Sequence, residues 1–346
     1  MTVEGLRIAG SLFGLAYGDA LGKPTEFLTV DEIVRHFGAD GPTDLPEPAL
    51  VTDDTQMALA VGEGLAEVLR GDGTAQHPLT AEVLAAVWSR RFVEWAHSPD
   101  NNRAPGMTCL RACGALAEGE PWIKATQMSS KGCGANMRVT PVGLIAGISS
   151  STRAGAAQLQ AALTHGHPTG LAASELTAYA TWWLLDGMDP AEVPGALRAR
   201  AREQREVYHH AWLGELWQRS HDPSPESFMA RGWDECLGVL DRLDAALAAA
   251  DRKSDPCEAT GEGWIAEEAL ATALLCFLLC PDDPRAALRR AAVTKGDSDS
   301  IAALAGAFAG AAHGLAAFPD GWDERIEYRQ RLTAVAAGLA VAAPGA

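Results

Sequence analysis

The chain has 346 residues, of which 47% are hydrophobic and 21% are charged, and its formal net charge at pH 7 is −17. This composition is typical of a globular protein and not of a disordered one. The negative charge argues against broad, non-specific nucleic-acid binding, because the phosphates would be repelled. The apolar stretch 6–17 leads into no convincing cleavage site, and the run 269–280 is too short to span a bilayer. We therefore expect a cytoplasmic protein without a membrane partner.

Glycines at every fourth position mark two predicted helices at opposite ends of the chain. The first set is Gly10, Gly14, Gly18 and Gly22, and the second is Gly306, Gly310 and Gly314. On a helix such glycines lie along one face and let another backbone approach closely. Our hypothesis is that these helices belong to a central layer that holds together the acidic segments described below.

Apolar residues at helical spacing predict further helices along most of the chain. The expected helical stretches are 56–70, 80–95, 109–118, a helix that begins near Arg138, 154–163, 170–187, 191–219, 229–250, 264–280, 284–293 and a final helix after Glu327. Turn-forming residues predict loops at 71–78 and 97–108. Because the sequence shows neither strand-helix alternation nor a repeat of fixed period, we expect an all-α protein. We expect one domain over 1–346, with a variable excursion at about 186–260.

The seven cysteines form no C-x-x-C pair. Cys109 and Cys113, and likewise Cys276 and Cys280, are four residues apart, as expected for buried positions on one helix face. This pattern favours reduced core cysteines in a cytosolic protein over metal ligands.

Two short acidic clusters, one early and one late, are candidate cation ligands. They are Thr52-Asp53-Asp54-Thr55 and Asp297-Ser298-Asp299-Ser300, each at the start of a predicted helix. Carboxylates and hydroxyls are the oxygen ligands that Mg²⁺ and Mn²⁺ prefer, so the clusters would build a two-metal site if the fold brings them together. The alternative is that each cluster is a helix N-cap, with Asp53 and Gln56 in a capping box. Each cluster has more oxygens than a cap needs, which favours the metal site.

Three further features offer weaker signals. The loop Gly132-Cys133-Gly134-Ala135 resembles a backbone cradle for phosphate, but it lacks the Walker lysine and follows no strand, which argues against an ATPase. His165 and His167 are compatible with ligand contact or with structural hydrogen bonds. Glu26 lies on a predicted loop, where a lone glutamate is ordinarily solvated.

Together these motifs resemble the ADP-ribosylglycohydrolase family, which includes dinitrogenase-reductase-activating glycohydrolase. The matching stretches are GSLFGLAYGDALGKPTEF at 10–27, VTDDTQMALA at 51–60, KGCGANMRVTPVGL at 131–144, LTHGHP at 163–168, GWIAEEALATAL at 263–274 and KGDSDSIAALAGAFAGAAHG at 295–314. They follow the family's order and span most of the chain. The pairing of TDDTQM with the late GDSDSIA motif is the specific part, and residues 186–260 carry little of the resemblance.

The resemblance implies an all-α orthogonal bundle with two Mg²⁺ ions, replaceable by Mn²⁺, in a cleft. The implied metal ligands, of which Asp299 would bridge, are Thr52, Asp53, Asp54, Asp297, Asp299 and Ser300. Serine stands at 298 and 300 where relatives usually have threonine, and it keeps the coordinating hydroxyl. The loop 132–135 would hold the pyrophosphate and His165 would line the ADP-ribose cleft. Glu26 or a metal-bound aspartate, Asp54, would carry the catalytic proton.

The implied activity is Mg²⁺-dependent hydrolysis of the N- or O-glycosidic bond that links ADP-ribose to a protein side chain, nucleic acid or small molecule. The bond would break through an oxocarbenium-like state. Apart from the resemblance, our default expectation for the oligomeric state is a monomer. Arginine-specific relatives often carry an acidic residue where this chain has Ala104. This departure puts ADP-ribosyl-arginine in doubt and leaves the other linkages open. The alternatives are a catalytically silent ADP-ribose-binding or crystallin-like member of the family, and a phosphohydrolase that releases AMP.

Overall fold

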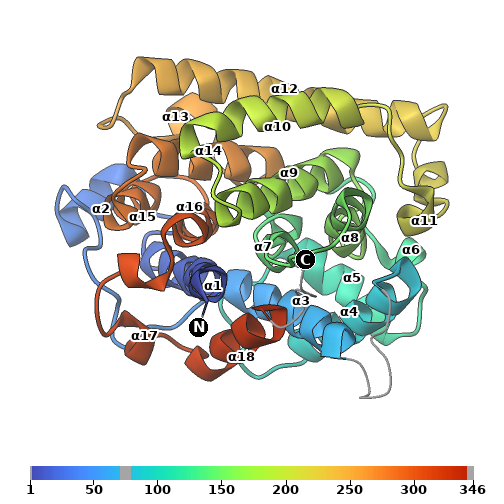
Figure 1. The fold of residues 1–346 in the computed structure, drawn as a ribbon, viewed down its shortest axis with the longest axis horizontal. Helices are drawn as coiled ribbons and strands as arrows, with labels where there is room; N and C mark the ends of the chain where they lie inside the picture. Colours follow the sequence, from blue (N-terminus) through green and yellow to red (C-terminus); the bar gives the residue numbers. More distant parts are fainter. Residues whose placement is uncertain (1, 71–78, 341–346) are drawn as a thin grey trace.

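Helices build the described part of the chain, residues 2–70 and 79–340, in this computed structural model (Figure 1). These residues contain no strand, and their β pairing amounts to three isolated bridges. The all-α prediction is therefore confirmed, whereas the loop predicted at 71–78 lies outside the described residues. The α-helices are α1 (Val3–Gly22), α2 (Val30–Phe37), α3 (Asp53–Arg70), α4 (Ala81–Ala96), α5 (Met107–Ala117), α6 (Trp122–Ala125), α7 (Thr140–Gly143), α8 (Ser150–Ala162), α9 (Pro168–Leu185), α10 (Val193–Gln204), α11 (His210–Leu213), α12 (Pro225–Ala249), α13 (Cys257–Thr260), α14 (Ala266–Leu279), α15 (Pro284–Ala292), α16 (Ser298–His313), α17 (Trp322–Arg325) and α18 (Arg329–Ala340). The 3₁₀ helices are η1 (Cys133–Ala135), η2 (Pro190–Glu192), η3 (Leu216–Arg219) and η4 (Leu315–Ala317).

The two glycine-rich helices, α1 and α16, pack directly against each other at the centre of the fold (Figure 1). A methyl group added at Gly18 would lie 1.9 Å from the carbonyl oxygen of Ala302, so the two backbones touch. The contact continues to the start of α16, where a methyl group at Gly22 would lie 2.5 Å from the Cα atom of Asp299. The predicted central glycine layer is confirmed, and it brings the end of α1 to the late acidic cluster.

We expect Gly18→Ala to destabilise the protein by about 2 kcal/mol or more, because the new methyl group would collide with backbone atoms. Gly114→Ala is the matched control: Gly114 also lies inside a helix, α5, but apart from the backbone of that helix no atom of the described residues lies within 4 Å of its added methyl group. Alanine favours the helix over glycine by about 1 kcal/mol, so the control should be neutral or stabilising. Urea unfolding measures both, and equal unfolding midpoints for the two variants would contradict the close contact.

Two groups of helices cover the central pair (Figure 1). Helices α3 and α18 pack against α1, while α9, α14 and α15 pack against α16. The predicted excursion at about 186–260 contains α10 to α13. Helices α10 and α12 pack against α9, and α12 also packs against α14, burying Trp233 and Leu240 completely. Whether this segment is an excursion from a single domain stays a prediction.

Two predicted helices are wrong in their extent. The stretch 191–219 is divided into η2, α10, α11 and η3. Tyr208 stabilises the non-helical segments between these helices. Its hydroxyl donates to the carbonyl of Gly214 (3.0 Å) and accepts from the amide of Trp217 (3.3 Å). Near Arg138 the chain forms only η1 and the four-residue α7, which has Pro141 in its first turn, a position that proline favours.

Two helix starts differ from expectation because of their caps. Helix α2 was not predicted, although Thr29 and Glu32 form a capping box at its start. Helix α12 begins at Pro225 instead of 229, because Ser224 caps it and proline is favourable in a first turn. The helix predicted at 80–95 is confirmed as α4, and the Thr80 side chain caps it by accepting a hydrogen bond from the amide of Val83.

All seven cysteines are free, and six of them are buried. Cys280, at the end of α14, is half-buried. The prediction of buried cysteines is therefore confirmed for Cys109, Cys113 and Cys276, but it is wrong for Cys280, which follows the last turn of α14. No helix in residues 2–70 or 79–340 combines the length and the apolar character that crossing a membrane requires.

Candidate metal-binding active site

Asp19, a buried residue of α1, fixes the start of α3. Its carboxylate accepts hydrogen bonds from the backbone amides of Thr52 (2.9 Å) and Thr55 (3.0 Å) and from the Thr55 hydroxyl (2.5 Å). Amides at a helix start otherwise need a capping side chain. Asp19 therefore caps α3 from a neighbouring helix and leaves the aspartates of α3 available for another partner.

The capping-box interpretation is accordingly wrong for Asp53 and Gln56, although the hydroxyl of Thr52, just before α3, does accept from the amide of Asp54 (3.3 Å). Gln56 does not reach back to Asp53, because its amide group accepts from the Trp95 indole (3.0 Å) and donates to the Asp100 carbonyl (3.2 Å). Asp297 occupies the N-cap position of α16 without making a side-chain capping hydrogen bond. The side chain of Asp299 accepts from the first-turn amide of Ser300 (3.0 Å), so α16 does not need the carboxylate of Asp297, which stays available for another partner.

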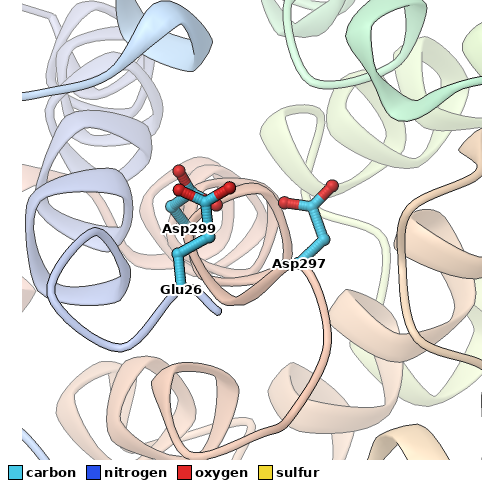
Figure 2. Close-up of side chains that lie close together, drawn as sticks. All are labelled: Glu26, Asp297 and Asp299. Atoms are coloured by element: carbon cyan, nitrogen blue, oxygen red, sulfur yellow. The ribbon is translucent and has the colours of Figure 1, made fainter. Parts of the chain in front are cut away.

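The early and late acidic clusters meet in one cleft of about 220 Å³. Helix α3 contributes Asp53 and Asp54, the start of α16 contributes Asp297 and Asp299, and the turn after α1 contributes Glu26. Carboxylate oxygens of Glu26, Asp297 and Asp299 lie within 4.8 Å of one another. Figure 2 shows these three side chains gathered at the N-terminal end of α16. The fold thus makes the juxtaposition on which the metal hypothesis depends.

Burial and mutual repulsion act against carboxylates that share this cleft. Burial, followed by the charge of Asp299, raises the pKa of Glu26 to about 9 and the pKa of Asp53 to about 7. The same two causes raise the pKa values of Asp54 and Asp297 well above their usual range. Without a cation, several of these groups would therefore hold protons at neutral pH.

The residues of the cleft fit a hard divalent cation. The side-chain atoms that could coordinate a cation are mainly carboxylate and hydroxyl oxygens, the ligands that Mg²⁺ takes. The Oδ1 atom of Asp54 is buried and has no hydrogen-bond partner among the described residues. Of the described residues that line the cleft, none is lysine or arginine, and the buried Arg138, whose charge interacts with Asp53, lies outside the lining. A bound cation would supply both the missing partner and the missing charge.

The glycine loop borders the cleft, but several of its amides are already in use. Gly132, Cys133 and Gly134 line the cleft, whereas Ala135 is buried outside its lining. The Cys133 amide donates to the carbonyl of Trp264 (3.0 Å), and the Ala135 amide donates to the carbonyl of Gly132 (3.5 Å). The loop therefore offers a pyrophosphate fewer free N–H groups than its sequence suggested, and that role stays a prediction.

The two histidines of LTHGHP have different surroundings. His165 lines the cleft, and its Nδ1 lies 2.7 Å from the hydroxyl of Thr164. Burial, followed by the charge of Arg138, holds the pKa of His165 well below its usual range, so a neutral ring faces the cleft. His167 lies outside the cleft lining and caps α9, where its side chain accepts from the Thr169 amide (3.3 Å). The structural interpretation is confirmed for His167.

One predicted metal ligand does not line the cleft, and the sequence analysis missed three residues that shape or line the site. Thr52 is not part of the cleft lining, and its hydroxyl lies 3.2 Å from Oδ2 of Asp54. The role of Asp19 was missed, although a lone acid on a glycine-rich helix is the kind of signal that marks a buried polar contact. Met107 and Trp264 also line the cleft, and both are large apolar side chains with substantial exposure.

Comparison with known proteins identifies the family of this chain. The sequence matches the ADP-ribosylglycohydrolase family model over residues 3–345. It is 28% identical to the ADP-ribosylarginine hydrolase Tri1 of Pseudomonas putida, over 98% of this chain and 79% of that protein. It is 25% identical to the ADP-ribosyl-(dinitrogen reductase) glycohydrolase of Rhodospirillum rubrum, over 93% of this chain and 91% of that protein. A solved structure described as an ADP-ribosylglycohydrolase-related protein complex matches with a TM-score of 0.66 and 26% identity, covering 98% of each chain. The chain therefore belongs to the ADP-ribosylglycohydrolase family.

Proposed function

We propose that the protein is a Mg²⁺-dependent hydrolase that cleaves the glycosidic bond between ADP-ribose and a modified target, releasing ADP-ribose. The chain belongs to a family that is named for the hydrolysis of ADP-ribosyl bonds. The metal, its number of two ions and the linkage are the proposed parts. The convergence of Glu26, Asp297 and Asp299 in one cleft is the observation that carries the proposal. Mn²⁺ should substitute, because it accepts the same oxygen ligands.

The residues of the cleft divide into two tasks. The side chains that would hold the cations are Asp53, Asp54, Asp297, Asp299 and Ser300, with Thr52 behind Asp54. When bound, the cations supply polarisation of the ribose hydroxyls and of the attacking water. Glu26 would transfer a proton from its carboxyl oxygen to the glycosidic nitrogen or oxygen of the leaving group. It belongs to the same cluster and is partly shielded from solvent. Asp54 is the second candidate for this proton.

The substrate preference is proposed from Ala104, which lines the cleft with a φ of +52°. Because this neutral residue stands where arginine-specific relatives often carry an acid, we propose that linkages other than ADP-ribosylarginine are preferred. Ala104→Asp should raise kcat/KM for an ADP-ribosylarginine peptide, relative to a serine-linked one, by about tenfold through a charge-assisted hydrogen bond. Aspartate also tolerates positive φ. Ala104→Asn is the uncharged control, and the same change in both variants would contradict the argument.

A panel of arginine-, serine- and nucleic-acid-linked ADP-ribose adducts, with products identified by mass spectrometry, tests the function. We expect free ADP-ribose from at least one adduct with Mg²⁺ and none with EDTA. AMP as the product would establish a phosphohydrolase instead. Binding of ADP-ribose without turnover of any adduct would favour a silent binding or structural role. The proposed setting is the cytoplasm, with the protein acting as a monomer on an ADP-ribosylated partner.

A further inference from the structure

The turn that carries Glu26 ends in a strained and exposed aromatic residue, Phe27. Its φ of +64° lies in the left-handed region, which a residue with a side chain adopts at an energetic cost. Its side chain is 67% exposed, so burial of the ring in the core does not offset that cost. Another contact must therefore help to hold this conformation.

Trp264, which lies just before α14, supplies that contact. The rings of Phe27 and Trp264 are stacked, with their centroids 5.6 Å apart and their planes 15° apart. Trp264 lines the cleft, whereas Phe27 does not. The carbonyl of Trp264 also accepts the hydrogen bond from the amide of Cys133, so the Trp264 segment is tied to the glycine loop. The stack thus connects the turn after α1 to another wall of the cleft.

The other contacts of the turn hold mainly the residues before Glu26. The amide of Glu26 donates to the carbonyl of Gly22 (3.0 Å), and the hydroxyl of Thr25 donates to the hydroxyl of Ser298 (3.0 Å). After Glu26, the amide of Leu28 donates back to the carbonyl of Thr25 (3.1 Å). These bonds shape the turn and its start, while the Phe27 ring is the side chain that links its far end to the cleft wall.

We propose that Phe27 and Trp264 are a pair of positioning residues, whose stacking holds Glu26 over the acidic cluster. This inference rests on the function proposed for Glu26. A proton carrier must stay within hydrogen-bond reach of the reacting atom, and small displacements of a catalytic group reduce the rate strongly. Phe27 then acts through Glu26 and needs no contact of its own with the substrate.

Two substitutions at Phe27 test whether its aromatic ring is responsible for the effect on Glu26. We expect Phe27→Ala to lower kcat about two- to tenfold with little change in KM, as expected for loss of one aromatic stack. The Mg²⁺ concentration that gives half-maximal thermal stabilisation should also rise, because a displaced Glu26 would place less negative charge beside Asp297 and Asp299, whose carboxylate oxygens lie within 4.8 Å of its own. Phe27→Tyr keeps the ring and should restore both quantities.

Phe37→Ala is the matched control for loss of an exposed aromatic ring. Phe37 ends α2, has 38% exposure and does not line the cleft. This variant should leave kcat and the Mg²⁺ midpoint at their wild-type values. Because Phe27 is more exposed than Phe37, Phe27→Ala should also keep the wild-type Tm without Mg²⁺. Wild-type kcat and Mg²⁺ midpoint in Phe27→Ala, or failure of Phe27→Tyr to restore them, would overturn the proposal.

A double-mutant cycle tests the pair itself. If Phe27 acts through its stack, Phe27→Ala should have no further effect on the Mg²⁺ midpoint in a Trp264→Ala background. An effect of equal size in both backgrounds would show that the two rings act separately, and the proposal would be wrong. The Mg²⁺ measurement needs no ADP-ribosylated substrate. A wild-type protein that hydrolyses no adduct would therefore refute the proposed function, while the cycle would still decide on the pair.

Discussion

Asp54→Asn should remove most of the Mg²⁺-dependent stabilisation and lower turnover at least about 100-fold. Substitution of a residue that only hydrogen-bonds to a metal ligand can already cost that much, and Asp54 is proposed to be a ligand itself. In EDTA the same variant should be more stable than the wild type at neutral pH. Asp54 is 3% exposed, its Oδ1 atom has no partner, and burial together with the charge of Asp299 disfavours its ionised form. Asparagine removes that unfavourable charge and, with it, a cation ligand. Thermal unfolding with Mg²⁺ and with EDTA, together with adduct turnover, measures these effects.

Asp299→Asn should behave in the same way, because Asp299 lies in the three-acid cluster and its charge raises the pKa values of the surrounding acids. Asp320→Asn is the control. Asp320 is an exposed aspartate on the loop before α17, and its substitution removes the same charge from the protein. The control should change neither turnover nor the response to Mg²⁺. Full Mg²⁺ stabilisation and full turnover in both Asp54→Asn and Asp299→Asn would end the assignment of the metal site.

The sequence was sufficient to predict the central helices and the acids of the cleft, for a physical reason. Glycine at every fourth position has one main use in an α-helix, close backbone approach, and a methyl group at Gly18 or Gly22 would indeed meet the backbone of α16. Consecutive carboxylates such as Asp53 and Asp54 are costly to bury without a cation. Both patterns are local in the sequence and constrain the tertiary structure strongly, so they could be recognised before the fold was known.

The remaining features of the site depend on contacts between distant segments. Asp19 caps α3 across 33 residues, which no local capping pattern reveals. The stack of Phe27 on Trp264 joins segments that are far apart in the sequence, and each residue alone is an ordinary aromatic side chain. The break in the stretch 191–219 likewise depends on the inward-pointing hydroxyl of Tyr208. Periodicity describes one element at a time and therefore could not predict these three contacts.

Removal of divalent cations should make the stability of the protein fall as the pH rises from about 5 to about 9. Burial, followed by the charge of Asp299, raises the pKa of Asp19 to about 7, of Asp53 to about 7 and of Glu26 to about 9. In the unfolded chain these groups titrate near pH 4. The folded protein therefore binds more protons than the unfolded chain in this range. Its unfolding free energy should decrease by roughly 1.4 kcal/mol per pH unit for each extra proton, and the loss is complete only above the folded pKa values.

Urea unfolding at a series of pH values, once with EDTA and once with saturating Mg²⁺, measures this effect. Bound cations favour the ionised carboxylates, so the decrease should be small with Mg²⁺, and the stabilisation by Mg²⁺ should grow with pH. Burial lowers the pKa values of His165 and His167, so their titration weakens the fold below about pH 6.5 in both conditions. It therefore cancels in the difference between the two curves. Parallel curves would mean that the clustered acids do not hold the cation, because cation binding to ionised carboxylates must compete with their protons.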